Sequence, residues 1–297
     1  MRTILITGAS SGIGLAAAVE LARRGERVFA SMRNPANSGA LRTALDDAGV
    51  EAEVIQLDVT DNDSVTKAVA GVLERAGSID VLVNNAGVTT VGPLEFTSDE
   101  ELLRTFDTNV FGVLRTTRAV LPSMRGSRRG RIVNISSAAA HPRVGIRLWG
   151  PYAASKAALH ALSLELLKEV APLGIEVVLL EGGVSGQTAA WNAPRASAAA
   201  FAGGDYAFSE RVSAAQIAAA TSGEDATPKV ASLVADACTI EAPPVRFRPE
   251  LQSGIDLVNQ IPDETFLRLA RGDTDPGVYA GLAGFWPLQA SLVAAND

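Results

Sequence analysis

The chain has 297 residues, of which 47% are hydrophobic and 20% are charged. These values are typical of one large or two small globular domains, and they exclude disorder for most of the chain. Lys and Arg number 26 against 33 Asp and Glu, which gives a net charge of −7 and disfavours a nucleic-acid binder. The single cysteine, Cys238, excludes an internal disulfide. No zinc-type Cys/His cluster is present, so no metal site is expected.

The apolar run near the N-terminus covers only residues 4–6, which is too short for a signal peptide. No segment approaches the roughly 18 uninterrupted apolar residues that a membrane-spanning helix needs. A lone cysteine suits a reducing compartment. We therefore expect a cytoplasmic protein without a membrane span.

Short β-branched runs alternate with longer segments of helical spacing along the chain. The pattern predicts strands at 4–6, 27–30, 53–57, 81–83, 131–135, 175–180 and 245–247, and helices at 12–24, 35–48, 61–76, 98–124, 152–171 and 263–271. Continuously apolar strands separated by helices indicate a parallel sheet covered on both faces. The expected fold class is α/β, a doubly wound, Rossmann-type three-layer sandwich.

No linker-like run divides the chain, so we predict a single domain over 1–297. Residues 1–182 form its cofactor and catalytic part, because the strand–helix alternation ends there. Residues 183–226 are rich in Ala, Gly and Ser and are interpreted as a substrate lid. Residues 250–297 are predicted to be a C-terminal extension.

A glycine-rich turn follows the first predicted strand, in the sequence Thr7-Gly8-Ala9-Ser10-Ser11-Gly12-Ile13-Gly14. Glycine permits a tight turn and lets backbone N–H groups approach a diphosphate, and the following helix N-terminus favours anions. The spacing is not the common G-x-G-x-x-G. Its place between a strand and a helix nevertheless predicts a dinucleotide site.

Tyr152 and Lys156 are four residues apart and share one helix face. A phenol ordinarily titrates near pH 10, too high for a base at neutral pH. A nearby ammonium favours the phenolate, so we expect Lys156 to lower the pKa of Tyr152. The spacing indicates an acid/base pair. Leu148 and Trp149, just before this pair, are candidates to line the substrate cavity.

The glycine turn resembles the cofactor loop of the short-chain dehydrogenase/reductase family. Asn84-Asn85-Ala86-Gly87 resembles the family's NNAG motif, and Asp58 and Asn109 match its adenine-contacting aspartate and helix asparagine. Asn134-Ile135-Ser136-Ser137 and Tyr152-Ala153-Ala154-Ser155-Lys156 match the serine and Y-x-x-x-K motifs. These matches occur in the family's order over residues 3–183. A looser resemblance, in Ser31-Met32-Arg33-Asn34-Pro35 and around 180–183, is to the hydroxysteroid/retinol dehydrogenase-like branch.

The resemblance implies a role for each matching residue. Tyr152 would exchange a proton with the substrate oxygen, and Ser137 would hydrogen-bond that oxygen. Lys156 would hold the nicotinamide ribose, and Asn109 would hold a water that relays protons. The implied cofactor contacts are Gly8, Ser10, Ser11, Gly12, Ile13, Gly14, Arg33, Asp58, Val59, Asn85, Ala86, Gly87, Tyr152, Lys156, Gly183 and Val184.

The sequence departs from the family pattern in two places. Ser137 and Tyr152 are 152 − 137 = 15 residues apart, about two more than usual, which leaves Ser136 as the alternative to Ser137. Gly182 stands where many members have proline, and Thr188 is the candidate for a threonine that follows. Of the two histidines, His160 is interpreted as a packing or interface residue. His141 lies in the lengthened loop and is a candidate for substrate contact, although this is not its favoured interpretation.

The second predicted strand ends in Ala30-Ser31-Met32-Arg33-Asn34, without the carboxylate that binds the ribose of NAD. Arg33 suits a 2′-phosphate, so NADP(H) is favoured over NAD(H). The sequence thus predicts an NADP(H)-dependent oxidoreductase that interconverts a ketone or aldehyde and an alcohol, with an apolar small-molecule substrate. The alternatives are a non-catalytic dinucleotide sensor or scaffold, disfavoured by the intact motifs, and a sugar-nucleotide epimerase or dehydratase, disfavoured by the glycine spacing.

Surplus apolar residues on the helices at 98–124 and 152–171 predict a homodimer or homotetramer. They are Leu102, Leu103, Phe106, Val110, Phe111, Val113 and Leu114 on the first helix, and Leu159, Leu162, Leu164, Leu166 and Leu167 on the second. The tail from residue 250 is a competing cover for the same surface.

Overall fold

A computed structural model of the chain describes residues 1–141, 146–181, 204–221 and 225–247, with isolated positions between 262 and 271. Within these residues the strands are β1 (Thr3–Ile6), β2 (Arg27–Met32), β3 (Glu53–Gln56), β4 (Val81–Asn84), β5 (Gly130–Ile135), β6 (Ile175–Leu180) and β7 (Arg246–Phe247). They pair in parallel in the order β3-β2-β1-β4-β5-β6-β7. From β1 the chain first adds β2 and β3 on one side, then crosses over and adds β4 to β7 on the other side.

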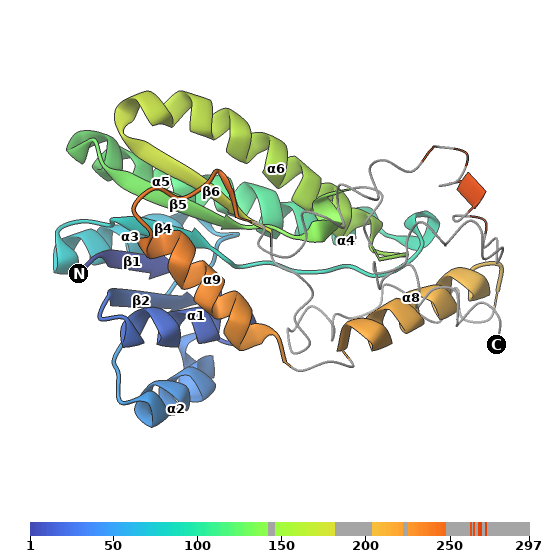
Figure 1. Cartoon of the computed structure of the whole chain (residues 1–297), viewed down its shortest axis with the longest axis horizontal. Coiled ribbons are helices and arrows are strands. Elements are labelled where there is room, and N and C mark those ends of the chain that lie inside the picture. Colours follow the sequence, from blue (N-terminus) through green and yellow to red (C-terminus); the bar gives the residue numbers. More distant parts are fainter. Residues whose placement is uncertain are drawn as a thin grey trace.

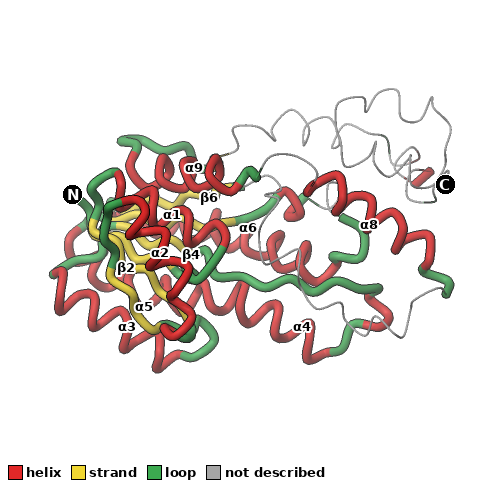
Figure 2. The backbone as a smooth tube through the Cα atoms, turned by 90° about the horizontal axis from the view of Figure 1, so that it is seen from below, coloured by secondary structure: helices red, strands yellow, loops and turns green. Residues whose placement is uncertain are grey.

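Helices cover both faces of this sheet, and further helices lie beyond one end of its strands (Figures 1 and 2). Their bounds are α1 (Gly12–Arg23), α2 (Gly39–Ala48), α3 (Asn62–Ala76), α4 (Asp99–Phe106), α5 (Gly112–Ser127), α6 (Gly150–Val170), α8 (Ala207–Thr221) and α9 (Thr227–Thr239). One buried cluster joins α1, α2 and α9 to the sheet, and the other joins α3, α5 and the end of α6 to it. The predicted three-layer α/β fold is confirmed.

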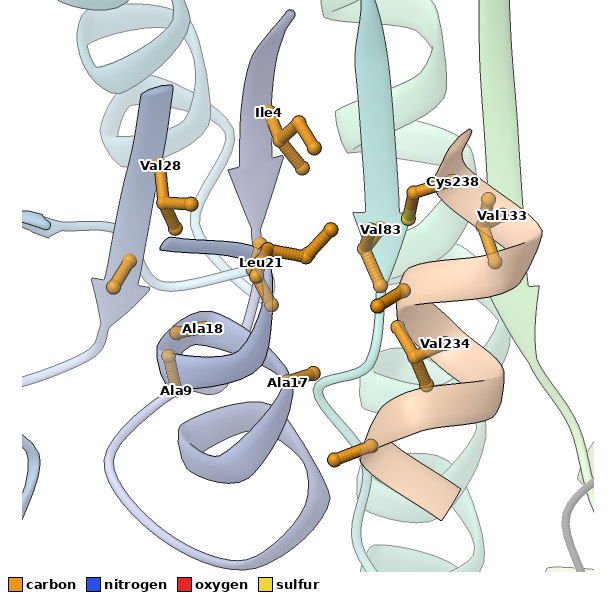
Figure 3. Packing of buried hydrophobic residues seen from close by; sticks show 14 of the residues in the cluster. Ile4, Ala9, Ala17, Ala18, Leu21, Val28, Val83, Val133, Val234 and Cys238 are labelled. Carbon is orange, nitrogen blue, oxygen red and sulfur yellow. The ribbon is translucent and has the colours of Figure 1, made fainter. Parts of the chain in front are cut away.

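The strands are continuously apolar because both of their faces are covered. In β1, Ile4 and Ile6 belong to the cluster beneath α1 and α9, whereas Leu5 belongs to the cluster on the other face. Figure 3 shows Leu21 of α1 and Val234 of α9 directed toward the strands. This packing fixes the carboxyl ends of the strands, where the motif residues lie.

One predicted helix differs from the structure, and one observed helix was not predicted. The helix predicted at 98–124 is instead α4, a π-helical turn at Asp107–Phe111, and α5. The prediction treated this segment as one regular helix, whereas the π-turn inserts one extra residue between two α-helical segments. Helix α9 is not predicted at all, although Val230, Val234 and Cys238 lie four residues apart and are buried.

Helix α8 occupies part of the predicted lid and lies away from β1 and β2 (Figure 1). Its Gln216 side chain accepts a hydrogen bond from the backbone N–H of Arg147 at 3.0 Å. Tyr206, just before the helix, donates to Glu95 at 2.6 Å. The rest of the predicted lid and most of the 250–297 extension, including most of the predicted helix at 263–271, lie outside the described residues. The division into lid and extension thus stays a prediction.

None of the helices in the described part of the chain has both the length and the apolar character needed to cross a bilayer.

Candidate active site

The glycine-rich turn opens α1 at the carboxyl edge of β1. Gly8 and Gly12 adopt positive φ angles of 70° and 57°, which glycine reaches without strain. Ser11 precedes α1 with an extended backbone and makes no side-chain capping hydrogen bond, and the first turn contains no acidic residue. A helix start of this kind attracts anions, because its N–H groups and dipole carry partial positive charge.

The NNAG segment is bonded to this turn from β4. The Asn85 side chain donates to the carbonyl oxygens of Thr7 and Gly8 at 2.9 and 3.0 Å. The Thr7 hydroxyl accepts from the backbone N–H groups of Asn85 and Ala86 at 3.0 and 3.1 Å. A Cβ on Gly14 would lie 2.4 Å from both the Asn85 amide nitrogen and the Gly8 carbonyl oxygen. The two motifs thus form one close-packed unit that tolerates no side chain at Gly14.

Tyr152, Lys156 and Ser137 meet where α6 crosses the end of β5. The hydroxyl of Ser137 is hydrogen-bonded to the phenol of Tyr152. Ser137 directly follows β5 and caps a short 3-10 turn by accepting from Ala139 N–H at 3.2 Å. The Lys156 ammonium lies 5.7 Å from the Tyr152 ring centre and donates to the Ile135 carbonyl at 2.8 Å. The fold therefore places a hydroxyl, a phenol and an ammonium together.

Burial sets the direction of both pKa shifts in this group. It raises the pKa of Tyr152, and the hydrogen bond with Ser137 only partly opposes that shift. The net shift is therefore opposite to the lowering that we expected from Lys156, and that effect of Lys156 stays a prediction. Burial also lowers the pKa of Lys156 to about 8. The phenol is thus protonated at neutral pH and suited to donate a proton.

Ser136 lies beside Ser137 but is held differently. Its backbone N–H donates to the Leu180 carbonyl at 2.8 Å, and its hydroxyl is buried without a hydrogen-bond partner among the described residues. Because Ser137 is the one bonded to the Tyr152 phenol, the geometry favours Ser137 over Ser136 for the substrate-facing position.

Asn109 lies in the π-helical turn between α4 and α5 and is completely buried. Its side chain accepts from Val88 N–H at 2.8 Å and donates to the Val88 carbonyl at 2.9 Å. It also donates to the Ser155 hydroxyl at 2.9 Å. The side chain therefore joins the segment after β4 to the first turns of α6. π-Turns of this kind are frequent at functional sites.

The residues expected at the adenosine end lie on the other half of the sheet. Arg33 is exposed immediately after β2. The Asp58 carboxylate accepts from the backbone N–H and the hydroxyl of Thr60 at 2.9 and 2.7 Å. Val59 is buried against Gly112, where a Cβ would lie 2.9 Å from the Val59 side chain. Ser10 and Ile13 belong to the glycine turn, whereas Gly183, Val184 and Thr188 lie outside the described residues.

A row of buried, hydrogen-bonded polar side chains, which the sequence analysis missed, connects the strands and helices that carry the site. Thr116 donates to Asn84 at 2.6 Å, Asn84 donates to Asn134 at 2.9 Å, and Asn134 donates to Ser163 at 2.8 Å. It links α5, β4, β5 and α6. Asn84 and Asn134 are the terminal and penultimate residues of two apolar strands, and this break in the apolar pattern is the signal that could have revealed them.

Trp149 and Leu148, the predicted lining of the substrate cavity, lie in the loop before Tyr152. The Trp149 ring is buried and lies edge-on to the Tyr152 ring, with centroids 5.6 Å apart. Leu148 has a φ of 66°, an uncommon conformation for this residue type, and its carbonyl accepts from Gly92 N–H at 2.7 Å. These contacts hold the loop that presents Tyr152.

The geometry suits a nicotinamide dinucleotide, because a helix start without a side-chain cap faces the same sheet edge as the Tyr152–Lys156 pair. A Cβ on Gly87 would lie 3.3 Å from Asn109 Oδ1 and 3.9 Å from Lys156 Nζ, so this glycine lies directly beside both side chains. This arrangement suits a dinucleotide-binding protein of the doubly wound α/β class.

Comparison with known proteins places the chain more narrowly. The family model for short chain dehydrogenase matches residues 2–197. The chain belongs to the short-chain dehydrogenase family, as the motifs indicated. Relatives that are retinol dehydrogenases support the expected branch of that family.

Two curated relatives illustrate the similarity. Retinol dehydrogenase 8 of Bos taurus is 43% identical over 186 residues, which are 61% of this chain and 58% of that protein. The 3-ketodihydrosphingosine reductase of Bacteroides thetaiotaomicron is 41% identical over 183 residues, which are 61% of this chain and 63% of that protein. The matched region thus spans less than two thirds of either relative.

Solved structures extend the likeness over nearly the whole chain. A short-chain dehydrogenase from Streptomyces avermitilis has a TM-score of 0.75 and 34% identity, covering 95% of this chain and 98% of that one. A metagenomic oxidoreductase in complex with NADP has a TM-score of 0.63 and 26% identity, covering 82% and 95%. An NADH-dependent reductase in complex with NAD has a TM-score of 0.56 and 34% identity, covering 62% and 78%. Family members thus bind either nicotinamide dinucleotide.

Proposed function

We propose that this protein is an NADP(H)-dependent oxidoreductase that interconverts a ketone or aldehyde and an alcohol. The observation that carries the proposal is the hydrogen bond between Ser137 and the Tyr152 phenol, with the Lys156 ammonium 5.7 Å from the same ring. A protonated phenol next to a hydroxyl donor is the arrangement that a carbonyl oxygen needs when it becomes an alcohol.

Each residue has a distinct part in this reaction. When bound, the cofactor supplies or accepts the hydride. Tyr152 donates a proton to the carbonyl oxygen during reduction and removes it from the alcohol during oxidation. Ser137 hydrogen-bonds the same oxygen and stabilises the charge that develops on it. The raised pKa of Tyr152 keeps the proton on the phenol at neutral pH.

Lys156 and Asn109 act around that proton transfer. Lys156 would bind the nicotinamide ribose hydroxyls and, as the nearest ammonium, favour the phenolate once proton transfer begins. Asn109 holds the Val88 segment and Ser155 in place, and it positions the start of α6. Gly8, Ser11, Gly12 and Gly14 would hold the diphosphate at the start of α1.

The substrate is proposed to be an apolar carbonyl compound or alcohol. Two curated relatives are named for a retinol and for a 3-keto sphingoid base. The buried ring of Trp149 lies edge-on to Tyr152 and provides an apolar wall close to the phenol. We also propose that the lid includes α8, because Tyr206 and Gln216 attach it to loops beside α6.

A panel of ketones, aldehydes and alcohols tests this function through the absorbance of the reduced cofactor. Long-chain and cyclic apolar compounds should be turned over faster than short polar ones, and NADPH should support more activity than NADH. A protein that binds the dinucleotide but turns over no member of the panel would instead be a dinucleotide sensor or scaffold.

A further inference from the structure

Both histidines of the chain meet one carboxylate, that of Glu181, directly after the end of β6. His141 Nε2 lies 2.9 Å from Glu181 Oε2, and His160 Nε2 lies 3.4 Å from Glu181 Oε1. The two imidazole rings are 5.4 Å apart and nearly perpendicular. The chain has only 2 histidines, so each of them is used here.

The three side chains come from three separate elements. His141 follows the 3-10 turn that begins after Ser137, and Glu181 directly follows β6. His160 lies on α6 one and two turns beyond Lys156 and Tyr152, on the same helix face. Only the fold brings them together, which is why no spacing along the chain signals a metal-binding cluster.

The carboxylate is deeply buried. The Glu181 side chain is 0% exposed, and those of His141 and His160 are 14% and 10% exposed. A buried carboxylate is costly unless positive charge or hydrogen-bond donors compensate it. Two imidazoles can meet this need with a proton, or together with the carboxylate they can hold a metal ion.

The spacing of the donor atoms fits a metal ion as well as the hydrogen bond between His141 and Glu181. The three ligand atoms lie within 4.8 Å of one another. Zinc bonds of about 2.0–2.1 Å in tetrahedral geometry place ligand atoms roughly 3.3 Å apart. The observed 2.9 and 3.4 Å lie on either side of that separation. Two histidines and one glutamate also form a donor set that zinc uses when a fourth position remains for water.

Ser136 supplies a further polar group at the same corner of the sheet. Ile135 pairs with Leu180, and Ser136 N–H donates to the Leu180 carbonyl, so the register continues to Ser136 beside Glu181. Side chains alternate along a strand, so Ser136 lies on the same face of the sheet as Asn134. Asn134 donates to Ser163 on α6, and Ser163 lies one helical turn beyond His160. The Ser136 hydroxyl is buried without a partner among the described residues, as a donor to a metal-bound water would be.

We propose that His141, His160 and Glu181 form a binding site for a divalent transition-metal ion, with zinc the best match. The ion ties the turn after Ser137 to α6 and to the end of β6, so its role is structural. It fastens the loop that carries Ser137 against the helix that carries Tyr152. The proposal is independent of the reaction that the protein catalyses, because metal binding is measured without substrate or cofactor.

The test titrates zinc into the full chain, purified without a polyhistidine tag and stripped with a chelator. One equivalent should bind per chain, measured against a chromophoric competitor. Cobalt should give the intense visible absorption of a four-coordinate site. His160→Gln and Glu181→Gln should weaken zinc binding by more than the roughly 10–100-fold that loss of a supporting hydrogen bond costs.

Two control variants separate this site from others. Cys238→Ser removes the one thiol, and Glu176→Gln removes a carboxylate near the opposite end of β6. Both variants should bind zinc like the wild type.

If Glu181→Gln does not fold, the melting temperature of the wild type provides the test: zinc should raise it, whereas magnesium should not. Less than one equivalent of zinc on the wild type, or equal binding by the His160 and Glu181 variants, would show a metal-free ion-pair network and overturn the proposal.

Discussion

Asn109 donates a 2.9 Å hydrogen bond to the hydroxyl of Ser155, and that hydroxyl in turn donates to the Tyr152 carbonyl at 2.7 Å. The π-helical turn is thereby coupled to the first turn of α6. Because Asn109 also bonds both backbone groups of Val88, its carboxamide acts mainly through positioning. The proton donor of the proposed reaction is thus held from a segment more than forty residues earlier in the chain.

Replacement of Asn109 by Ala should destabilise the fold. The backbone groups of Val88 would lose their partners in a buried place, and a buried polar group without a partner costs about 1–3 kcal/mol. We expect the free energy of unfolding in urea to fall by about 2–4 kcal/mol, since a small cavity adds to that loss. Asn62→Ala, at an exposed position of α3, is the matched control. Equal stability of the two variants would show that the Val88 contacts are unimportant.

Tyr152→Phe should nearly abolish turnover and leave cofactor affinity within a few-fold of the wild type. Only the phenolic proton is lost, and a positioned acid or base contributes about 10²–10⁴-fold to the rate. Steady-state kinetics and cofactor titration by fluorescence measure the two effects. Thr66→Ala removes a hydroxyl from an exposed position of α3 and should keep the wild-type activity. A wild-type kcat in the Tyr152→Phe protein would refute the proposed acid/base role.

Lys156 should make the stability of the cofactor-free protein depend on pH. Burial lowers its pKa from 10.5 to about 8. Below pH 8 the folded and unfolded chains both carry the ammonium, and the folded chain bears the full cost of burying it. Between pH 8 and 10.5 the unfolded chain binds more protons, so stability should rise by roughly 3 kcal/mol.

The comparison with Lys156→Met isolates this contribution. The unfolding free energy of the wild type, measured relative to that of Lys156→Met, should increase from pH 7.5 to pH 10. All other titratable groups are present in both proteins, so their contributions cancel in this difference. Lys168→Met, at an exposed position of α6, should show no such shift. A constant difference over this range would mean that Lys156 titrates normally in the folded chain.

Arg33→Ala should weaken NADPH binding far more than NADH binding. A charge-assisted hydrogen bond contributes roughly 1.5–3 kcal/mol, which corresponds to one to two decades in Kd. Arg33 is exposed immediately after β2, where a guanidinium can reach a ribose phosphate. Calorimetric titration of both cofactors measures the change, with Arg23→Ala on α1 as the control. Equal wild-type affinities for NADPH and NADH would remove the basis for the preference.

Much of the fold was predictable because its determinants are local. Ile4-Leu5-Ile6 is completely buried, and a strand buried on both faces must be apolar throughout. Helix α9 escaped prediction because its core face is built largely of small residues such as Ala231 and Ala235. Small residues pack closely against α1 but give a weak amphipathic signal. The π-turn around Asn109 depends on contacts with Val88 and Ser155, which are distant in sequence.

Only those site residues that belong to recognisable sequence motifs could be predicted. Ser137, Tyr152 and Lys156 were expected together, and the structure brings them together. The shift in the pKa of Tyr152 was not foreseen, since it reflects burial that spacing cannot reveal. The convergence of His141 and His160 on one carboxylate was missed for the same reason: parallel strands and a crossing helix create it.

Exposed apolar side chains on α4, the π-turn and α6 carry the last prediction. Leu103 is 64% exposed, Phe111 46%, Leu102 39% and Leu162 37%. Other members of the predicted surplus, such as Val110 and Leu159, are buried within the chain. Exposed apolar groups on neighbouring helices tend to be covered by association, most often across a twofold axis. We therefore expect a dimer or tetramer that buries this surface.

Light scattering coupled to size exclusion measures the mass directly. The wild type at micromolar concentration should elute as a multiple of the 30.8 kDa chain. Leu103→Glu should shift it toward the monomer, because a buried unpaired carboxylate at an interface is strongly unfavourable. Ile240→Glu places the same charge on an exposed residue after α9 and should leave the mass unchanged. A wild-type mass of one chain would exclude a stable oligomer and favour the segment after residue 250 as the cover of this surface.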